Sequence, residues 1–197
     1  MEADAAAARH KARSVTPSDC VFCSIIHNHQ SIHKQSESTS TNGQALAEKT
    51  EDGEQSTVVW ENELVVIFKD KYPATDCHYQ CVTRLHIPTV RSLQCWEDVV
   101  LVREMLKAGK RFLKEVMLIE VDENGARYLN TSTKTEVKFG FHVPPFRSID
   151  HLHMHIIAGE MGFLKSMKYK EGGWHYISAD QLIADLEKKY PMPEKEE

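Results

Sequence analysis

Three histidines alternate with apolar residues over His151–Ile157, and this feature limits the fold of the chain more than any other. The stretch reads HLHMHII, and polar/apolar alternation with a period of two is typical of a β-strand with one face in the core. Residues two apart share a face on a strand, whereas on a helix they diverge. We therefore expect three imidazoles on one face, suited to metal binding or to phosphate and proton chemistry.

Composition limits the partners of the chain. Its 197 residues fit one domain with tails. Lys and Arg number 24 against 29 Asp and Glu, a net charge of −5, so a nucleic acid is not an expected partner. No apolar stretch is long enough to predict a membrane anchor. Five cysteines, an odd number at low density, favour reduced thiols in the cytoplasm, with the nucleus also open.

The chain divides into a leader, one domain and a tail. We predict a disordered leader over residues 1–17, a domain over 18–189 and a tail over 190–197. Within the domain, residues 27–56 are rich in Ser, Thr, Gln, Glu and His. Such a stretch has little to bury, so it is interpreted as a disordered insertion with solvated histidines.

The remaining patterns predict an α+β fold. Short strands are expected at 57–60, 64–68, 77–84, 126–130 and 137–141, besides the histidine strand. A long helix is expected at 92–116, where apolar residues recur at helical spacing around the weak point Gly109. Ser178 with Gln181 forms a capping box for a last helix. The prediction is a mostly antiparallel sheet of about five strands with two main helices.

Several motifs in order resemble the histidine triad (HIT) superfamily of nucleotide hydrolases and transferases. The His-x-His-x-His pattern is joined by Cys20-Val21-Phe22-Cys23, by Phe68-Lys69-Asp70 and by the stretch from His78 to Ile87. The segments 139–148 and 172–180 are similar to the third subtype of the Hint branch, the adenosine 5′-monophosphoramidases. The resemblance runs over 18–189 apart from 27–56, and it implies a HIT-like fold.

The resemblance implies a role for each polar residue of the motif. His153 would attack the α-phosphate of a nucleotide, since a neutral imidazole is a competent nucleophile near pH 7. Water would then hydrolyse the nucleotidyl-histidine to release AMP. The backbone carbonyl of His151 would fix the tautomer of His153. His155 and Ser148 would bind phosphate oxygens, and His78 would relay a proton near the leaving group.

The resemblance also implies the residues that bind the nucleotide. Asp70 would accept hydrogen bonds from the ribose hydroxyls. Four apolar side chains would enclose the base: Val21, Phe22, Ile25 and Phe68. From residue type alone, Phe22, Ile25 and Phe68 are interpreted as ordinary core. Lys69, Lys71, Arg147 and Ser148 complete the predicted site. Its ligand would be a purine nucleotide, AMP or an AMP-linked amine.

A C-x-x-C pair, Cys20 and Cys23, has the spacing of half a tetrahedral zinc site. In some members of the superfamily two histidines complete such a site, and they match His86 and His151 here. A structural zinc and two free thiols are both open interpretations. No cofactor is expected to be required for catalysis.

Taken together, the residues and the resemblance predict a phosphoramidase that hydrolyses AMP-linked amines, with lysyl adenylate among the candidate substrates. Two alternatives stay open. One is removal of AMP from adenylated DNA ends, as in aprataxin, against which the acidic balance counts. The other is a non-enzymatic regulatory module that binds nucleotide or zinc. The resemblance also implies a homodimer.

Overall fold

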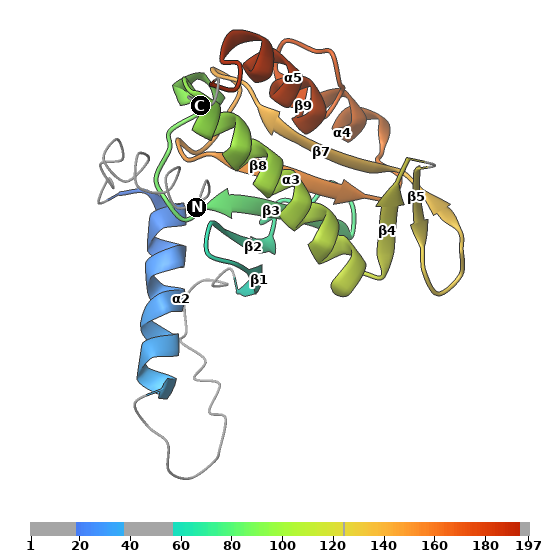
Figure 1. Ribbon diagram of the computed structural model, residues 1–197. Coiled ribbons are helices and arrows are strands. Elements are labelled where there is room, and N and C mark those ends of the chain that lie inside the picture. The colour runs from blue at the N-terminus through green and yellow to red at the C-terminus, as the bar shows by residue number, and fades with distance from the viewer. Residues whose placement is uncertain (1–18, 38–56, 124, 194–197) are drawn as a thin grey trace.

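The computed structural model describes residues 19–37, 57–123 and 125–193, so the predicted leader lies outside it. Its central sheet is crossed by one long helix, while the first helix projects away from the body (Figure 1). The elements are α2 (Val21–Glu37), β1 (Val58–Glu61), β2 (Val65–Lys69), β3 (Cys77–Thr83), a 3₁₀ turn (Val90–Ser92), α3 (Trp96–Glu115), β4 (Ile119–Asp122), β5 (Gly125–Tyr128), β6 (Lys134–Thr135), β7 (Val137–His142), β8 (His153–Ala158), α4 (Phe163–Lys168), β9 (Tyr176–Ser178) and α5 (Ala179–Lys189).

The strands form two antiparallel sheets. The larger has the order β1-β2-β3-β8-β7-β9, and the smaller has the order β4-β5-β6. The predicted α+β class is confirmed, and the two expected helices are α3 and α5. The described residues also contain α2 and α4, and the larger sheet alone has six strands rather than about five. The extra strands β4, β6 and β9 have only two to four residues each, too few to show a period in the sequence.

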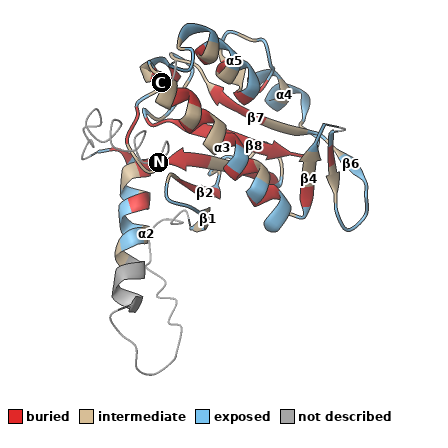
Figure 2. Ribbon diagram, in the orientation of Figure 1, coloured by how far each residue is buried: buried red, intermediate tan, exposed pale blue. Residues whose placement is uncertain are grey.

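Helix α3 covers one face of the larger sheet, and the core lies between them. Strand β8 is buried along its length (Figure 2). Its residues Met154 and Ile156 are fully buried in the core. A Cβ added at Gly109 of α3 would lie 3.0 Å from the Met154 Cε atom and 3.3 Å from Ile156 Cδ1. Gly109, which the sequence marks as a weak point of the helix, therefore permits close contact between helix and sheet.

Capping groups set the start of both main helices. The helix expected from residue 92 begins at Trp96, where the Asp98 carboxylate accepts a hydrogen bond of 3.0 Å from the Cys95 N–H group. The Ser178 hydroxyl accepts a 3.2 Å hydrogen bond from Gln181 N–H at the start of α5, which confirms the predicted N-cap.

Helix α2 extends farther than the sequence predicts. The expected insertion starts at residue 27, yet the helix continues to Glu37. No Gly or Pro interrupts these residues, and the Ser31 hydroxyl donates to the His27 carbonyl one turn earlier, at 2.9 Å. Phe22 and Ile26, near its N-terminal end, are buried. Residues 38–56 of the predicted insertion lie outside the described part of the chain.

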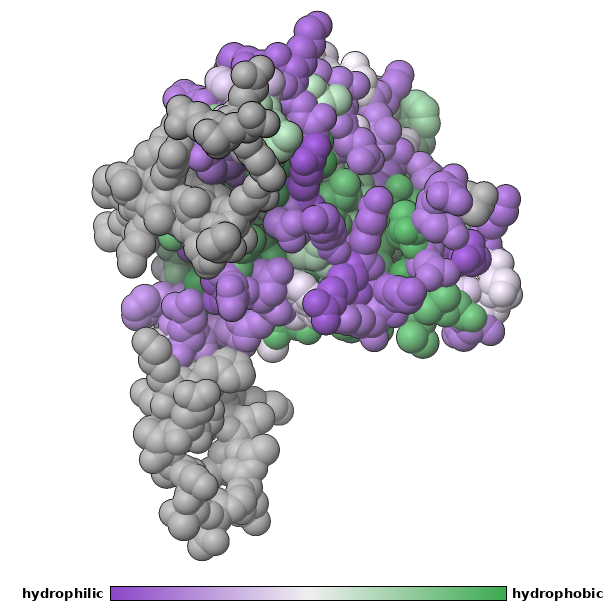
Figure 3. All heavy atoms as spheres, viewed as in Figure 1, coloured by the Kyte–Doolittle hydropathy of each residue, from purple (hydrophilic) through white to green (hydrophobic). Residues whose placement is uncertain are grey.

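The face that carries α3 is mostly hydrophilic. Figure 3 shows hydrophobic side chains gathered at its lower right, where α3 ends and β4 begins. Val116 and Leu118 lie at this end of the helix, 47% and 48% exposed. Within the described ranges, no helix is both long and apolar enough to cross a membrane.

Candidate functional site

Strands β3, β7 and β8 bring four histidines to the sheet face opposite α3. His155 of β8 pairs with Gln80 of β3 and with Gly140 of β7. Residues two apart on a strand share a face, so the following set, called the histidine face below, lies together. Its members are His78, His142, His153 and His155. His151, expected on the same strand, precedes β8 instead and belongs to a second cluster.

Hydrogen bonds fix the tautomers of His78 and His155. The Ala74 N–H group donates to His78 Nδ1 at 2.9 Å, so the His78 proton is on Nε2. That Nε2–H group lies 2.9 Å from His155 Nδ1 and donates to it. The proton of His155 is therefore on its own Nε2, which is buried without a partner among the described residues. A buried N–H group of this kind can bind an anionic oxygen.

Asp70, His78 and His155 could also be considered as metal ligands. Their ligand atoms lie within 4.8 Å of one another. A metal on His78 Nε2 would require a proton on Nδ1, which would then face the Ala74 N–H group. Asp70 itself accepts hydrogen bonds of 2.7 Å from Gln80 Nε2 and Tyr72 N–H. The three residues therefore form a hydrogen-bond network rather than a cation site.

His153 has the tautomer that a nucleophile needs. Its Nδ1–H group donates to the His151 carbonyl oxygen at 2.6 Å, which leaves an electron pair on Nε2. The side chain is buried, and burial lowers its pKa, so the ring is neutral at pH 7. A cavity of about 10 Å³, roughly the size of one water molecule, lies beside it. His142 and Arg147 also line this cavity.

His142 is a site residue that the sequence analysis missed. Its Nδ1–H group donates to the His175 carbonyl at 3.2 Å, and its Nε2 atom is buried without a partner among the described residues. The ring centroid lies 4.9 Å from that of His155, and burial lowers the pKa of His142 to about 4. The strand expected at 137–141 continues by one residue, and alternation from Gly140 would have placed His142 on this face.

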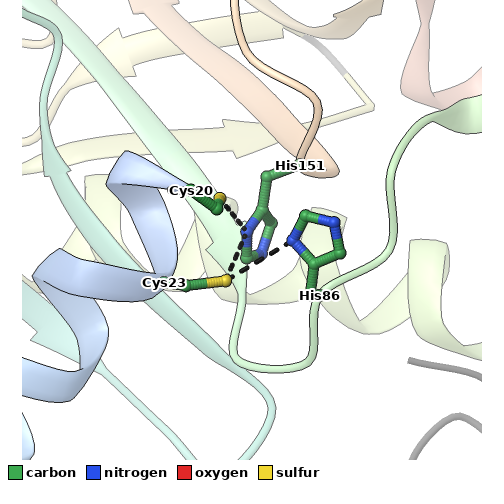
Figure 4. Close-up of side chains that lie close together, drawn as sticks. All are labelled: Cys20, Cys23, His86 and His151. Carbon is green, nitrogen blue, oxygen red and sulfur yellow. Dashed lines mark hydrogen bonds between the residues drawn. The ribbon is translucent and has the colours of Figure 1, made fainter. Parts of the chain in front are cut away.

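The second cluster joins three segments far apart in the sequence (Figure 4). Cys20 and Cys23 come from the start of α2, His86 follows β3, and His151 precedes β8. The Cys20 Sγ atom lies 3.4 Å from His151 Nδ1, and Cys23 Sγ lies 3.5 Å from the same nitrogen. Cys23 Sγ is 3.4 Å from His86 Nδ1. The four residues named for a zinc site are thus adjacent, and are called the thiol cluster below.

The geometry of the thiol cluster fits a tetrahedral zinc ion. Zinc binds sulfur at about 2.3 Å and nitrogen at about 2.0–2.1 Å, so tetrahedral S···N separations are about 3.5–3.6 Å, close to those present. His151 Nε2–H also donates to the Thr83 carbonyl at 2.7 Å, a partner typical of metal-binding histidines. Burial raises the pKa of the Cys23 thiol to about 12, and a bound cation would supply the charge that a thiolate requires.

The residues named for the base do not form an open slot. Phe22 and Phe68 are both buried, and their ring centroids lie 5.3 Å apart in an edge-to-face contact. Ile25 packs in the same apolar cluster, whereas Val21 is 56% exposed. In this arrangement the two rings occupy the space between them, as expected for core residues. Lys69 and Lys71 are exposed.

Arg147 and Ser148 lie beside a larger hollow of about 650 Å³. Cys20, His86 and Asp150 are among its described lining residues. Arg147, ion-paired with Asp150, also lines the small cavity at His153 and therefore borders both spaces. Ser148, named for phosphate binding, lines the hollow and is not among the described residues around the His153 cavity.

Comparison with known proteins gives concordant results. The family model described as "Scavenger mRNA decapping enzyme C-term binding" matches residues 44–169. Adenosine 5′-monophosphoramidase HINT3 of Mus musculus is 37% identical over 130 residues, covering 65% of this chain and 70% of the relative. An Arabidopsis thaliana relative, the bifunctional adenosine 5′-phosphosulfate phosphorylase/adenylylsulfatase HINT4, is 37% identical over 138 residues, covering 68% and 82%. A solved histidine triad protein from Clostridium difficile shares the fold, with a TM-score of 0.50, 19% identity, and coverage of 75% and 96%.

Proposed function

The chain belongs to the histidine triad superfamily, and from this premise we propose that it is a nucleotide phosphoramidase. Its substrates would be adenosine 5′-monophosphoramidates. His153 Nε2 attacks the α-phosphorus, the P–N bond breaks, and the leaving amine takes up a proton from solvent water. Water then cleaves the nucleotidyl-histidine, which releases AMP and restores the imidazole. The observation that carries the proposal is the His153–His151 carbonyl bond, because it leaves Nε2 as the free electron pair.

The other members of the histidine face supply binding rather than bond formation. The unpartnered Nε2–H group of His155 would donate to a phosphate oxygen, and His78 holds it in that tautomer. Asp70, beside this pair, would accept from the ribose hydroxyls. For a base to lie between Phe22 and Phe68, the two rings would have to separate. Arg147, with Ser148 next to it, would contact the leaving group from the hollow.

The leaving group is the part of the substrate that differs among relatives. The mouse relative is named for phosphoramidates and the plant relative for adenosine 5′-phosphosulfate, and both kinds of substrate contain AMP. Assays should therefore compare an AMP-amide with adenosine 5′-phosphosulfate. An adenylated DNA end is the third substrate to test, although the net charge of −5 disfavours a DNA backbone.

We also propose that the thiol cluster holds a structural zinc ion. The charge of the ion would stabilise the thiolates, and its bonds would attach α2 to the segments that carry His86 and His151.

A homodimer is proposed from the exposed apolar side chains of Val116 and Leu118. A cytoplasmic location, with the nucleus also open, is proposed because all five cysteines are free thiols.

Trapping the covalent intermediate tests the function. Protein mixed with adenosine 5′-phosphoramidate is quenched in denaturant without acid, digested, and searched by mass spectrometry for AMP on His153. The His153→Gly variant should lose the adduct, with kcat/KM reduced by about 10³-fold or more. The exposed His27→Gln variant is the control and should keep wild-type activity. An adduct on another residue, or equal rates in His153→Gly and wild type, would refute the mechanism.

A further inference from the structure

The histidine face provides little positive charge for a reaction that needs it. Burial lowers the pKa of His78 to about 4 and that of His155 well below its ordinary value, so both rings are neutral at pH 7. Asp70 lies beside them, with its Oδ2 atom 3.4 Å from His78 Nε2. Phosphoryl transfer depends on stabilising the charge of the phosphate oxygens. A nearby cation would therefore have a direct effect on this site.

Lys168 is connected to the histidine face through the ring of Tyr169. It is the last residue of α4, and its Nζ atom lies 5.3 Å from the ring centroid of Tyr169. The buried Tyr169 ring in turn lies 5.4 Å from the His78 ring and 5.3 Å from the rings of His142 and His155. These separations place the Lys168 ammonium within about 11 Å of the centroids of the three histidine rings.

Electrostatic effects agree with this placement. After burial and other nearby groups, Lys168 is a further cause that lowers the pKa of His78, His142 and His155. Lys165, on the same helix, adds to the effect at His78, and its Nζ atom donates to the Pro73 carbonyl at 2.7 Å. The two lysines therefore differ in position although they lie three residues apart. Lys168 is the one that acts across the face.

The other cations near the site are already engaged, including Arg147, which lines the small cavity at His153. Arg147 forms an ion pair with Asp150. The Lys71 Nζ atom lies 5.7 Å from the centre of the Tyr72 ring, and Tyr72 is 77% exposed. The Lys168 side chain is exposed, and its long, flexible stem allows the ammonium to move toward a bound anion.

We propose that Lys168 binds the phosphate of the nucleotide, with its ammonium donating to a non-bridging oxygen that the His155 Nε2–H group also contacts. This inference rests on the proposed function, because it assumes that the α-phosphate lies on the histidine face. It adds a residue outside the motifs that indicated the family. Lys168 would bind the charged phosphate, whereas other residues would position the base.

Paired affinities for AMP and adenosine test the proposal, measured by isothermal titration calorimetry at low salt. Lys168→Met should weaken AMP binding by about tenfold, as expected for loss of a charge-assisted hydrogen bond, and leave adenosine binding unchanged. Lys165→Met is the matched control on the same helix and should weaken AMP binding much less than Lys168→Met, because the Lys165 ammonium is held by the Pro73 carbonyl. Lys168→Arg should restore most of the AMP affinity. Added salt should weaken AMP binding more in wild type than in Lys168→Met.

Each outcome discriminates. Equal AMP affinity in wild type and Lys168→Met overturns the role of Lys168, and so does an equal loss of AMP and adenosine, which would indicate a structural effect. If wild type binds AMP through Lys168 but forms no adduct on His153, the phosphoramidase mechanism fails while the phosphate contact stands. Absence of AMP binding to wild type overturns both.

Discussion

The thiol cluster and the histidine face each use a histidine, but with opposite ring nitrogens, although His151 and His153 are separated by only one residue. His151 ties its Nε2–H group to the Thr83 carbonyl and turns Nδ1 toward two sulfur atoms. His153 ties Nδ1–H to the carbonyl of His151 and leaves Nε2 free. The nitrogen held by a backbone carbonyl decides which nitrogen is left for chemistry, so the local backbone assigns the two rings to different tasks.

The two regions also share a structural connection. The peptide unit that holds the ring of His153 belongs to His151, whose own ring lies in the thiol cluster. Phe22, between the two cysteines in sequence, places its ring 5.8 Å from that of His151 and 5.3 Å from that of His153. The experiments below ask whether the regions can be disrupted separately.

The largest effect is expected from the thiol cluster. Cys23→Ser replaces a sulfur ligand with a hydroxyl, so bound zinc should be lost and the free energy of unfolding should fall by about 3 kcal/mol. Metal content by plasma mass spectrometry and urea unfolding measure the two quantities. Cys95→Ser is the control, because serine is a good N-cap for α3. Equal metal content in Cys23→Ser and wild type would contradict the proposal that the thiol cluster binds zinc.

Acid should destabilise the histidine face. Burial lowers the pKa of His78 in the folded protein to about 4, whereas the unfolded chain has a value of about 6.5. The unfolded state binds protons more readily in this interval, so stability is complete above pH 6.5 and falls as the pH drops toward 4. The expected loss from His78 is about 2 kcal/mol near pH 5. Urea unfolding across this range, with metal content measured at each pH, separates it from loss of zinc.

The acid effect has a specific control. His78→Phe should reduce the pH dependence without abolishing it, because burial also lowers the pKa of His142 to about 4, whereas the exposed His27→Gln should keep the wild-type slope. A slope that is the same in all three proteins would show that His78 is not the group responsible.

Gly140→Ala should damage the histidine face and spare the thiol cluster. An added Cβ would lie 2.5 Å from the Ile177 carbonyl oxygen and 2.6 Å from the Tyr176 hydroxyl. Overpacking of this kind should cost about 2 kcal/mol and reduce activity, with metal content unchanged. Gly162→Ala has nothing within 4 Å of its added Cβ and serves as the control. Loss of metal in Gly140→Ala would show that the two regions cannot be separated there.

The smallest effect is expected from the hydrogen-bond chain. His78→Leu removes the acceptor for Ala74 N–H and the donor to His155, so the His155 tautomer is no longer fixed. We expect kcat/KM to fall by about tenfold, roughly 1.4 kcal/mol, with metal content unaffected. His78→Gln, whose amide can still donate to His155, should retain more of the activity. Identical rates in the two variants would argue against a role for the donor.

Local patterns in the sequence predicted the parts of this fold that depend on neighbouring residues. Alternation located the histidine strand, although β8 begins at His153 and leaves His151 outside it, and the Ser178 cap located the last helix. The end of β7 was missed by one residue, and with it His142. Helix α2 continues past residue 27 because solvated residues without Gly or Pro are compatible with a helix as well as with a loop.

Features that depend on tertiary contacts could not be read from the sequence. The tautomer of His151 is set by the carbonyl of Thr83, 68 residues away in the chain. The contact between Phe22 and Phe68 joins a helix to a strand and fills the space where the resemblance placed a base. Lys168 belongs to a six-residue helix with no buried residue, so no hydrophobic pattern marks its position.

Arg147 borders both the small cavity and the hollow, and a shared boundary of this kind has a kinetic consequence. If the departing amine leaves through the hollow, the hollow is vacated while the nucleotide is still bonded to the protein. The molecule that enters next need not be water. An added alcohol or hydroxylamine that enters through the hollow would compete with water for the nucleotidyl-histidine. The ratio of AMP to the AMP adduct of the added nucleophile would report how freely the hollow admits solutes of different size.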